Sequence, residues 1–191
     1  REKTFLADHG FSVAPYAVLA SEDDARRVDA SLCPGIVKSA RMGYDGKGQV
    51  RVRTRAELVA AWQGLNGVPC VLEKMLPLAA ECSVIVARGR DGQMVHFPPQ
   101  RNLHRDGILA VTEVDASNLP PALAQKAVAA AKSIASGLQY VGVLCVEFFV
   151  LEDGSLVVNE IAPRPHNSGH YTIDACDVSQ FDLQVRTLAG L

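Results

Sequence analysis

From residue 143 to residue 161 the chain reads VLCVEFFVLE-DG-SLVVNEI, two apolar runs rich in strand-forming residues joined by Asp153-Gly154. An Asp-Gly pair between such runs is a strong signal for a β-hairpin, and a two-residue turn places Glu147 directly opposite Glu160. Like charges at opposed positions, about 4.5–5.5 Å apart at Cβ, destabilise a strand pair. A divalent cation would compensate, because Mg²⁺ takes one or two carboxylates together with phosphate oxygens and water. The hairpin alone equally allows one glutamate to point to solvent and a bulge to shift the register.

The nine residues after this hairpin, APRPHNSGH (162–170), place an arginine, two histidines, an asparagine and a serine on one loop. Two prolines stiffen its backbone and disfavour a helix. The planar guanidinium of Arg164 suits a carboxylate, bicarbonate or phosphate. Taken singly, each of these side chains would be an ordinary surface or hydrogen-bonded group. Together, at the end of a strand that carries a carboxylate pair, they predict a site for an anionic substrate.

The composition indicates a globular protein with a small anionic ligand. The 191 residues suffice for one substantial core or two modest lobes, and a net charge of −2 gives no case for bulk nucleic-acid binding. Between residues 36 and 55 the basic residues nonetheless outnumber the acidic ones by six to one (Lys38, Arg41, Lys47, Arg51, Arg53 and Arg55 against Asp45). A local positive patch on a slightly acidic protein favours a small anion over a polymer.

Cysteine usage favours a reducing compartment, the cytoplasm. The five cysteines are odd in number and lack C-x-x-C spacing, so they indicate neither a zinc site nor a disulfide framework, and a reducing compartment fits them best. No signal peptide or apolar run of membrane length occurs, so no membrane partner is expected. The chain begins with Arg-Glu-Lys and lacks an initiator methionine, which suggests a piece of a longer protein.

A glycine-rich segment, GYDGKG (43–48), lies between two predicted strands. Glycines let the backbone approach a ligand, and successive N–H groups can cradle phosphate oxygens, with Lys47 adding charge. The spacing matches neither a P-loop nor a dinucleotide fingerprint, and many such segments are only flexible hairpin tips. Lys38 interrupts an apolar strand five residues upstream, where it could point toward phosphates or simply to solvent.

Three further residues are ambiguous in isolation. Glu73 ends an apolar strand, and Glu81 follows the expected crossing between lobes. An acid at such a place could accept from ribose hydroxyls while the neighbouring backbone pairs with an adenine edge, or it could face solvent. His104 is expected in a polar turn.

The predicted elements mix helices and hairpins. Helices are expected near residues 3–8, from the Ser21 N-cap, from a Thr54 cap with Glu57 in a capping box to about residue 65, over 120–138, and around 178–188. Strands are expected within the extended stretch 11–19 and at 35–39, 49–53, 68–76, 81–87 with 93–97, 109–114 and in the final hairpin. This pattern predicts an α+β fold with a small lobe up to about residue 76 and a larger lobe over 77–191.

Taken in order, these elements resemble the ATP-grasp superfamily, in which two α+β lobes grip a nucleotide between them. More narrowly, GYDGKGQ (43–49), NLHRDGI (102–108) and APRPHNSGH (162–170) are similar to the 5-(carboxyamino)imidazole ribonucleotide synthetases, the ATPase subunits of phosphoribosylaminoimidazole carboxylase. The resemblance covers nearly all of the chain. Family members carry a further domain before this region and another after it, so the resemblance implies an isolated ATP-grasp domain.

The resemblance implies an ATP-dependent carbon–nitrogen ligase of purine biosynthesis. ATP would phosphorylate bicarbonate to carboxyphosphate, and the amine of 5-aminoimidazole ribonucleotide would then take up the carboxyl group. The implied ATP contacts are Lys38, Gly43, Tyr44, Asp45, Gly46, Lys47, Gly48, Gln49, Glu73, Lys74, Met75, Leu76, Glu81, His104, Asn159 and Glu160. The implied Mg²⁺ ligands are Glu147 and Glu160. The implied substrate contacts are Tyr44 and Asp45 for the ribonucleotide, and Arg164, His166 and Asn167 for bicarbonate and carboxyphosphate.

Two alternatives stay open at this point. The chain could be an ATP-grasp ligase for another acid and amine, although the 162–170 loop argues against it. As a fragment without its flanking domains, it could also be a Mg·ATP-binding module without turnover. The family tends to form dimers, so a homodimer is a further expectation.

Overall fold

The computed structural model describes residues 2–40, 48–105, 107–115 and 117–191. Contacts divide the chain into two compact units. The first unit comprises the residues up to Val13, Leu78–Arg105 and Leu109–Leu191, and the second comprises Ala14–Pro77 and the short segment that ends at Ile108. Residues 2–13, which the expected division at residue 76 assigned to the small lobe, make their contacts with the C-terminal part of the chain instead.

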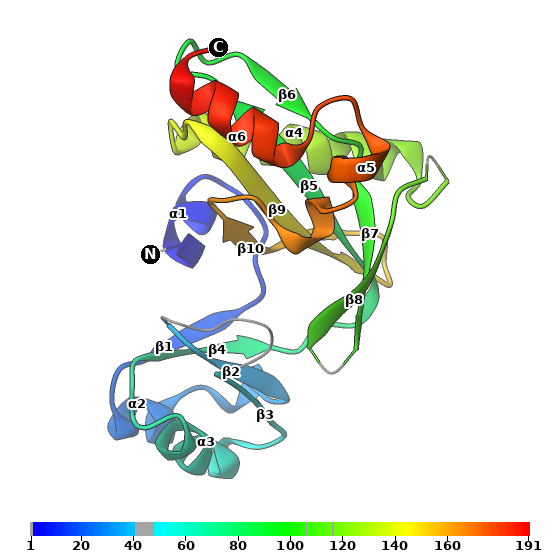
Figure 1. Cartoon of the computed structure of the whole chain (residues 1–191). Coiled ribbons are helices and arrows are strands. Elements are labelled where there is room, and N and C mark those ends of the chain that lie inside the picture. The colour runs from blue at the N-terminus through cyan, green and yellow to red at the C-terminus, as the bar shows by residue number, and fades with distance from the viewer. Residues whose placement is uncertain (1, 41–47, 106, 116) are drawn as a thin grey trace. The chain divides into compact units, whose positions relative to one another are not determined.

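The second unit is a four-stranded antiparallel sheet covered on one face by helices (Figure 1). Its strand order is β1 (Tyr16–Leu19), β4 (Cys70–Lys74), β2 (Gly35–Ser39), β3 (Gln49–Val52). Helices α2 (Glu22–Arg27) and α3 (Leu58–Gly64) and the 3₁₀ turn η1 (Ala30–Leu32) supply the apolar side chains that pack with Val37, Val52 and Leu72. Because side chains alternate along a strand, Lys38 of β2 and Glu73 of β4 lie on the opposite face of the sheet from this core.

The predicted helix over 54–65 is split in the structure. A 3₁₀ turn, η2 (Arg55–Glu57), precedes α3, and the Thr54 side chain makes no capping hydrogen bond. The expected capping box is therefore wrong: Glu57 reaches back past Thr54 to accept the backbone N–H of Arg53 at 2.9 Å. The N-cap predicted at Ser21 is confirmed, and it forms a capping box in which Ser21 and Asp24 each accept a backbone N–H of the other.

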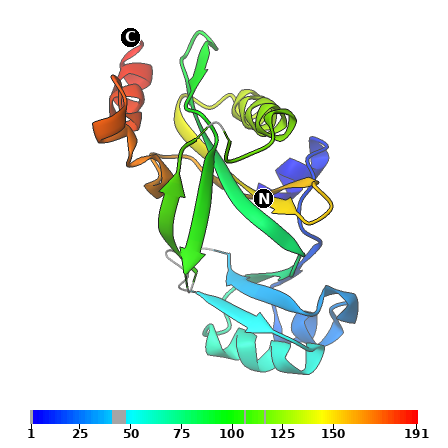
Figure 2. The same cartoon turned by 90° about the vertical axis from the view of Figure 1, so that its right-hand side faces the viewer.

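The first unit is built on a sheet with helices on both faces (Figure 2). The strand order is β10 (Leu156–Ala162), β9 (Gly142–Leu151), β5 (Leu78–Arg88), β7 (Gln100–Arg105), β8 (Ile108–Glu113), and β6 (Met94–His96) pairs with β5. Helix α4 (Pro121–Gly137) packs its apolar side on Val84, Val146 and Phe148, which point to one face. Helix α6 (Gln180–Ala189) packs Leu183 on the other face, beside Cys145. The shorter elements are α1 (Glu2–Asp8), η3 (Asn167–Gly169) and α5 (Thr172–Ala175).

The β9–β10 hairpin reaches its predicted pairing by an unexpected route. The turn is not two residues long: Leu151 donates to the Ser155 carbonyl at 2.9 Å, and Leu156 pairs with Val150. Gly154 has φ +79°, the left-handed conformation that a three-residue hairpin loop requires. This loop shifts the register by one residue, and a bulge between Val158 and Glu160 shifts it back, so Glu160 pairs with Glu147 as predicted.

Other predicted elements are confirmed with altered bounds, and one strand was missed. The stretch 11–19 contains a strand only at Tyr16–Leu19. Strand β7 (Gln100–Arg105), read from sequence as a polar turn, was missed because QRNLHR is too hydrophilic to resemble a strand. The α+β class is confirmed, and within the described residues no helix has both the length and the apolarity to cross a membrane.

Candidate functional site

One face of the first unit's sheet carries a line of polar side chains beneath the loop that follows β10. Ser83 of β5 is opposite Glu147 of β9 on one side and Gln100 of β7 on the other, and Glu81 is opposite Asn102. Since opposed residues of an antiparallel pair share a face, the register alone brings these side chains together. They lie on the face that α6 covers, away from the larger apolar core under α4.

Glu147 and His166 form the centre of this polar line. The ring Nε2 of His166 lies 2.9 Å from Oε1 of Glu147, with the two side chains only 13% and 15% exposed. Burial is the largest single influence and raises the pKa of the Glu147 carboxyl, but the interactions with His166, His104 and Asn159 together lower it by more, so the net pKa falls below its usual value. Glu147 is therefore held as a carboxylate, the form that can bind a cation.

Ser83 and Ser168 connect this pair to the neighbouring strands. Both serines are fully buried, with their hydroxyl oxygens 2.9 Å apart. The Ser168 hydroxyl also lies 2.9 Å from Nδ1 of His166, and Ser83 accepts the amide of Asn102 at 2.9 Å. Buried polar groups remain in a folded protein when they are hydrogen-bonded to one another, and this group is paired throughout.

Glu81 and His104 form a second acid–histidine pair at the β5–β7 edge of the same face. Nδ1 of His104 lies 2.9 Å from Oε2 of Glu81, within ion-pair distance although the angle is poor for a hydrogen bond. The contact with Glu81 raises the pKa of His104 despite burial, which lowers it. The prediction that His104 sits in a turn is wrong, because alternation along β7 aims it to this face with Gln100 and Asn102.

The carboxylate pair has the arrangement expected from the sequence. Glu160 is directly opposite Glu147, so both side chains leave the same face of the hairpin. Asn159, the extra residue of the bulge, donates its amide to Oε2 of Glu147 at 3.4 Å. Its carbonyl, displaced from the ladder by the bulge, accepts Nζ of Lys3 at 2.7 Å. Helix α1 thus stabilises the irregularity that keeps the two glutamates opposed.

The loop over 162–170 folds tightly against α6. His166 is bound on both sides of its backbone by the fully buried Gln180, whose Oε1 accepts its N–H at 2.9 Å and whose Nε2 donates to its carbonyl at 2.8 Å. A Cβ on Gly169 would come within 2.3 Å of Ile85 and 2.5 Å of Gln180, so only glycine permits this approach. The expectation of a loop without helix needs one correction, since Asn167–Gly169 form the 3₁₀ turn η3.

The three predicted substrate-binding residues do not all belong to the hydrogen-bonded group around Glu147. Arg164 is exposed, and its Nη1 donates to the carbonyl of Pro165 at 2.9 Å. Asn167 is likewise exposed within η3. Only His166 is both predicted and built into the buried chain of hydrogen bonds. The other two face solvent beside it, where a dissolved anion can reach them.

The second unit contains the remaining predicted residues that the structure describes. Lys38 on β2 and Glu73 on β4 are diagonal neighbours on the face opposite α2 and α3. Nζ of Lys38 lies 3.0 Å from Oε2 of Glu73, and the side chains are 22% and 8% exposed. A mostly buried pair of opposite charges is a stable arrangement only when it is well hydrogen-bonded, so its geometry is closely constrained.

The last residue of β4 and the residue after it both have their backbone donors occupied. The N–H of Lys74 donates to Pro15 and that of Met75 to Pro34, both at 2.9 Å. An adenine edge could therefore be bound there by backbone carbonyls or by Leu76, but not by these two N–H groups. Of the glycine-rich segment, only Gly48 and Gln49 are described: Gly48 has φ +75° and its carbonyl accepts the Ser39 N–H at 2.8 Å. Gly43, Tyr44, Asp45, Gly46 and Lys47 lie outside the described residues.

The site contains residues that sequence reasoning missed. Ser83, Gln100, Asn102, Ser168 and Gln180 are all buried polar side chains. QRNLHR (100–105) gave no signal for them, because five of its six residues are polar and the segment lacks the polar–apolar alternation of a half-buried strand.

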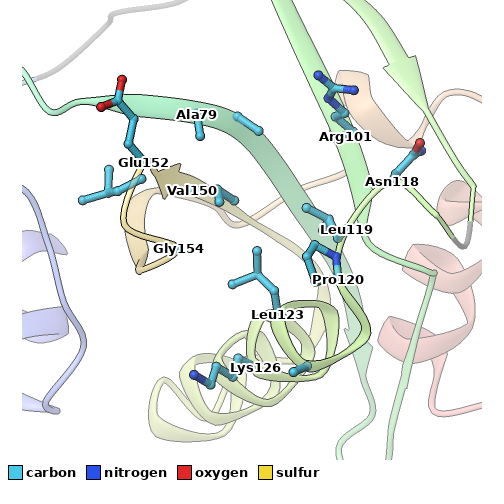
Figure 3. Close-up of a pocket in the computed structure, with 13 residues that line it drawn as sticks. Ala79, Arg101, Asn118, Leu119, Pro120, Leu123, Lys126, Val150, Glu152 and Gly154 are labelled. Atoms are coloured by element: carbon cyan, nitrogen blue, oxygen red, sulfur yellow. The ribbon is translucent and has the colours of Figure 1, made fainter.

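An open hollow of about 510 Å³ lies elsewhere in the first unit, near the start of α4 (Figure 3). Leu119, Leu123 and Val150 line it, with Arg101 and Lys126 among the polar residues around them. None of the predicted site residues lines this hollow, and Val150 belongs to the α4 face of the sheet. It is separate from the polar line described above.

Comparison with known proteins places the chain in a family. A model of the ATP-grasp domain matches residues 4–181. The N5-carboxyaminoimidazole ribonucleotide synthase of Brucella melitensis is 44% identical over an alignment that covers all of this chain and 53% of that protein. The Aspergillus clavatus synthase complexed with ATP has a TM-score of 0.92 and 34% identity, covering 99% of this chain and 50% of that one. The same enzyme with ADP and 5-aminoimidazole ribonucleotide has a TM-score of 0.89 and 32% identity, with equal coverage.

The chain spans about half the length of the curated relatives that it matches. Its two α+β units and antiparallel sheets confirm the predicted fold, and the family model covers nearly the whole sequence. The chain belongs to the ATP-grasp family.

Proposed function

We propose that this chain is the ATP-binding part of an N5-carboxyaminoimidazole ribonucleotide synthase, which uses ATP to join bicarbonate to the amine of 5-aminoimidazole ribonucleotide. The observation that carries the proposal is the pairing of Glu147 with Glu160 on one face of a hairpin, with His166 against Glu147. The names of the relatives, at up to 44% identity, support the same substrates.

The carboxylate pair fits a magnesium ion. Two opposed carboxylates on one face, one of them kept ionised, provide the hard oxygen ligands that Mg²⁺ prefers. Among the described residues no group of three or more His, Cys, Asp and Glu side chains could hold a metal. That agrees with an ion completed by phosphate oxygens and water rather than enclosed by protein. Such an ion would neutralise charge on the triphosphate, and Glu147 and Glu160 are the residues that would hold it.

The nucleotide contacts are proposed from both units taken separately. In the second unit Lys38 and the loop from Gly43 to Gln49 would bind the phosphates. Residues Glu73 to Leu76 would bind the ribose and the base. In the first unit Glu81, His104 and Asn159 would contact the nucleotide. The raised pKa of His104 supports this role, because a protonated imidazole adds a positive charge on the same face as the carboxylate pair.

The reaction needs positioning and charge neutralisation more than covalent help from the protein. A bicarbonate oxygen attacks the γ-phosphorus of ATP and the bond to ADP breaks, giving carboxyphosphate. The amine nitrogen then attacks the carboxyl carbon, the carbon–oxygen bond to phosphate breaks, and the amine loses a proton. The bicarbonate and carboxyphosphate would be positioned by Arg164, His166 and Asn167. The ribonucleotide would be positioned by Tyr44 and Asp45. The Arg164 guanidinium has five donors, and its bond to Pro165 uses one N–H.

Two measurements test the proposal against its alternatives. Calorimetry with Mg·ATP is expected to show binding that weakens when magnesium is removed. Phosphate release is expected only when bicarbonate and 5-aminoimidazole ribonucleotide are both present. Binding without any turnover would instead identify a nucleotide-binding module, and turnover with another acid or amine would identify a different ligase.

A matched pair of histidine variants assigns the role of the loop. His166→Asn removes the ring against Glu147 and is expected to reduce the substrate-dependent phosphate release. His170→Asn changes the same residue type four positions away, where the exposed ring stacks on Phe181 at 6.0 Å, and is expected to leave it unchanged. Equal effects of the two substitutions would contradict the proposed role of His166.

A further inference from the structure

We propose that Ser83 and Ser168, two buried serines with no assigned part in the chemistry, are positioning residues that hold His166 as the tautomer with its proton on Nε2. This inference rests on the proposed function for its consequence, since Glu147 is the carboxylate that His166 then contacts, but its geometry stands without that function.

The tautomer follows from the contacts of the other ring nitrogen. The backbone N–H of Ser168 donates to Nδ1 of His166 at 3.3 Å. A nitrogen that accepts a hydrogen bond in its ring plane carries no proton, so in the neutral ring the proton lies on Nε2. Nε2 is the atom 2.9 Å from Oε1 of Glu147, and it therefore donates to that carboxylate.

The Ser168 hydroxyl strengthens the same choice. It lies 2.9 Å from Nδ1, and a hydroxyl beside an unprotonated nitrogen donates to it. Its oxygen is then left to accept, and the partner on that side is the Ser83 hydroxyl at 2.9 Å. Ser83 in turn accepts from the Asn102 amide at 2.9 Å, and its single proton has a second acceptor in Oε1 of Gln100 at 3.0 Å. The donors that lead to His166 run from Asn102 through the two serines, and Gln100 competes for the Ser83 proton, which is why the contribution of Ser83 is the smaller one.

This series of hydrogen bonds is rigid because each of its residues belongs to a different element of the fold. Ser83 is on β5, Asn102 on β7 and Ser168 in η3, and the exposed fractions of the three are 0%, 4% and 0%. With water excluded, no solvent molecule replaces a lost partner, so the alternative tautomer would leave a buried donor and acceptor mismatched. The serines therefore control whether Nε2, the atom of His166 that faces Glu147, carries the proton, although neither serine touches the carboxylate.

Nitrogen-15 NMR of the histidine rings at about pH 8, above the ordinary imidazole pKa, tests this directly. In the unchanged protein His166 is expected to show an unprotonated Nδ1 and a protonated Nε2. Ser168→Ala should reduce the ratio of the two tautomers by about 2- to 10-fold, the factor that one net hydrogen bond is worth. Ser83→Ala should shift it in the same direction but less. Ser133→Ala, on the exposed side of α4, is the control and should leave the His166 signals unchanged.

Two results would overturn the inference. One is a protonated Nδ1 in the unchanged protein, which requires no variant and so cannot be confused with misfolding. The other is an unaltered tautomer ratio in a folded Ser168→Ala protein. Failure of the proposed function gives a different result: Glu147→Gln would then leave Mg²⁺-dependent ATP binding unchanged while the serine variants still shift the tautomer.

Discussion

Two strand pairs in this molecule place charged side chains beside one another, with opposite outcomes. On β2 and β4 the neighbours are Lys38 and Glu73, whose opposite charges meet at 3.0 Å. On β9 and β10 they are Glu147 and Glu160, which have like charges and are directly opposed. The two charges of the first pair attract each other, whereas the two charges of the second pair repel each other. A fold that keeps the second arrangement, and adds a bulge to restore it, has an arrangement that binding of a cation would stabilise.

The sharpest test of this contrast is Glu160→Gln, which keeps the shape of the side chain and removes its charge. If the pair holds an ion, Mg²⁺-dependent affinity for ATP should fall by about 10- to 100-fold, as is typical when a metal site loses a supporting group. Calorimetry with and without magnesium measures this affinity. Glu152→Gln, an exposed glutamate at the turn of the same hairpin, is the matched control. Equal affinities in both variants would remove the metal assignment.

On the sheet of the second unit, removal of one charge is expected to lower the stability of the protein. Glu73→Gln leaves the ammonium of Lys38, only 22% exposed, without its carboxylate partner. The free energy of unfolding should fall by about 1–3 kcal/mol, as measured by denaturant titration. A double-mutant cycle with Lys38→Met isolates the interaction energy of the pair. A coupling near zero would show that the pair contributes no stability.

The bulge in β10 can be tested through Lys3, which is 9% exposed and donates to the displaced carbonyl of Asn159. Lys3→Met keeps the apolar stem and removes the donor, so the free energy of unfolding should fall by about 1–2 kcal/mol. If the bulge keeps the glutamates opposed, Mg·ATP binding should weaken too. A loss of stability with unaltered binding would separate the bulge from the site.

The smallest expected effect concerns pH. The Glu81 contact raises the folded-state pKa of His104, so protonation of this ring stabilises the fold. The stabilisation is complete below the unfolded pKa of about 6.5 and is lost as pH rises through the folded value. Glu81→Gln should lower the His104 pKa in an NMR titration and flatten the fall of stability above about pH 6.5. An unshifted His104 titration would contradict the ion pair.

Much of the site could be predicted because its residues follow local patterns. The Asp-Gly hairpin, the polar loop after it and the lysine within an apolar strand are all readable along the chain. The Glu147–Glu160 pairing was predicted correctly from a turn of the wrong length, since the loop adds one residue and the bulge compensates. Loop length and bulges depend on backbone conformations such as that of Gly154, which the residue pattern does not specify uniquely.

The apolar runs, the turn positions and the order of the motifs can be read from the residues, because these features depend on periodicity and on neighbours along the chain. The partner of each polar residue depends on the packed structure. The residue pattern could not show that the Gln180 side chain hydrogen-bonds to the backbone of His166, fourteen residues away. Nor could it show that Ser83 hydrogen-bonds to Ser168, 85 residues away. Such contacts arise when strands and helices bury polar groups that must then find one another, and burial is a property of the packed chain.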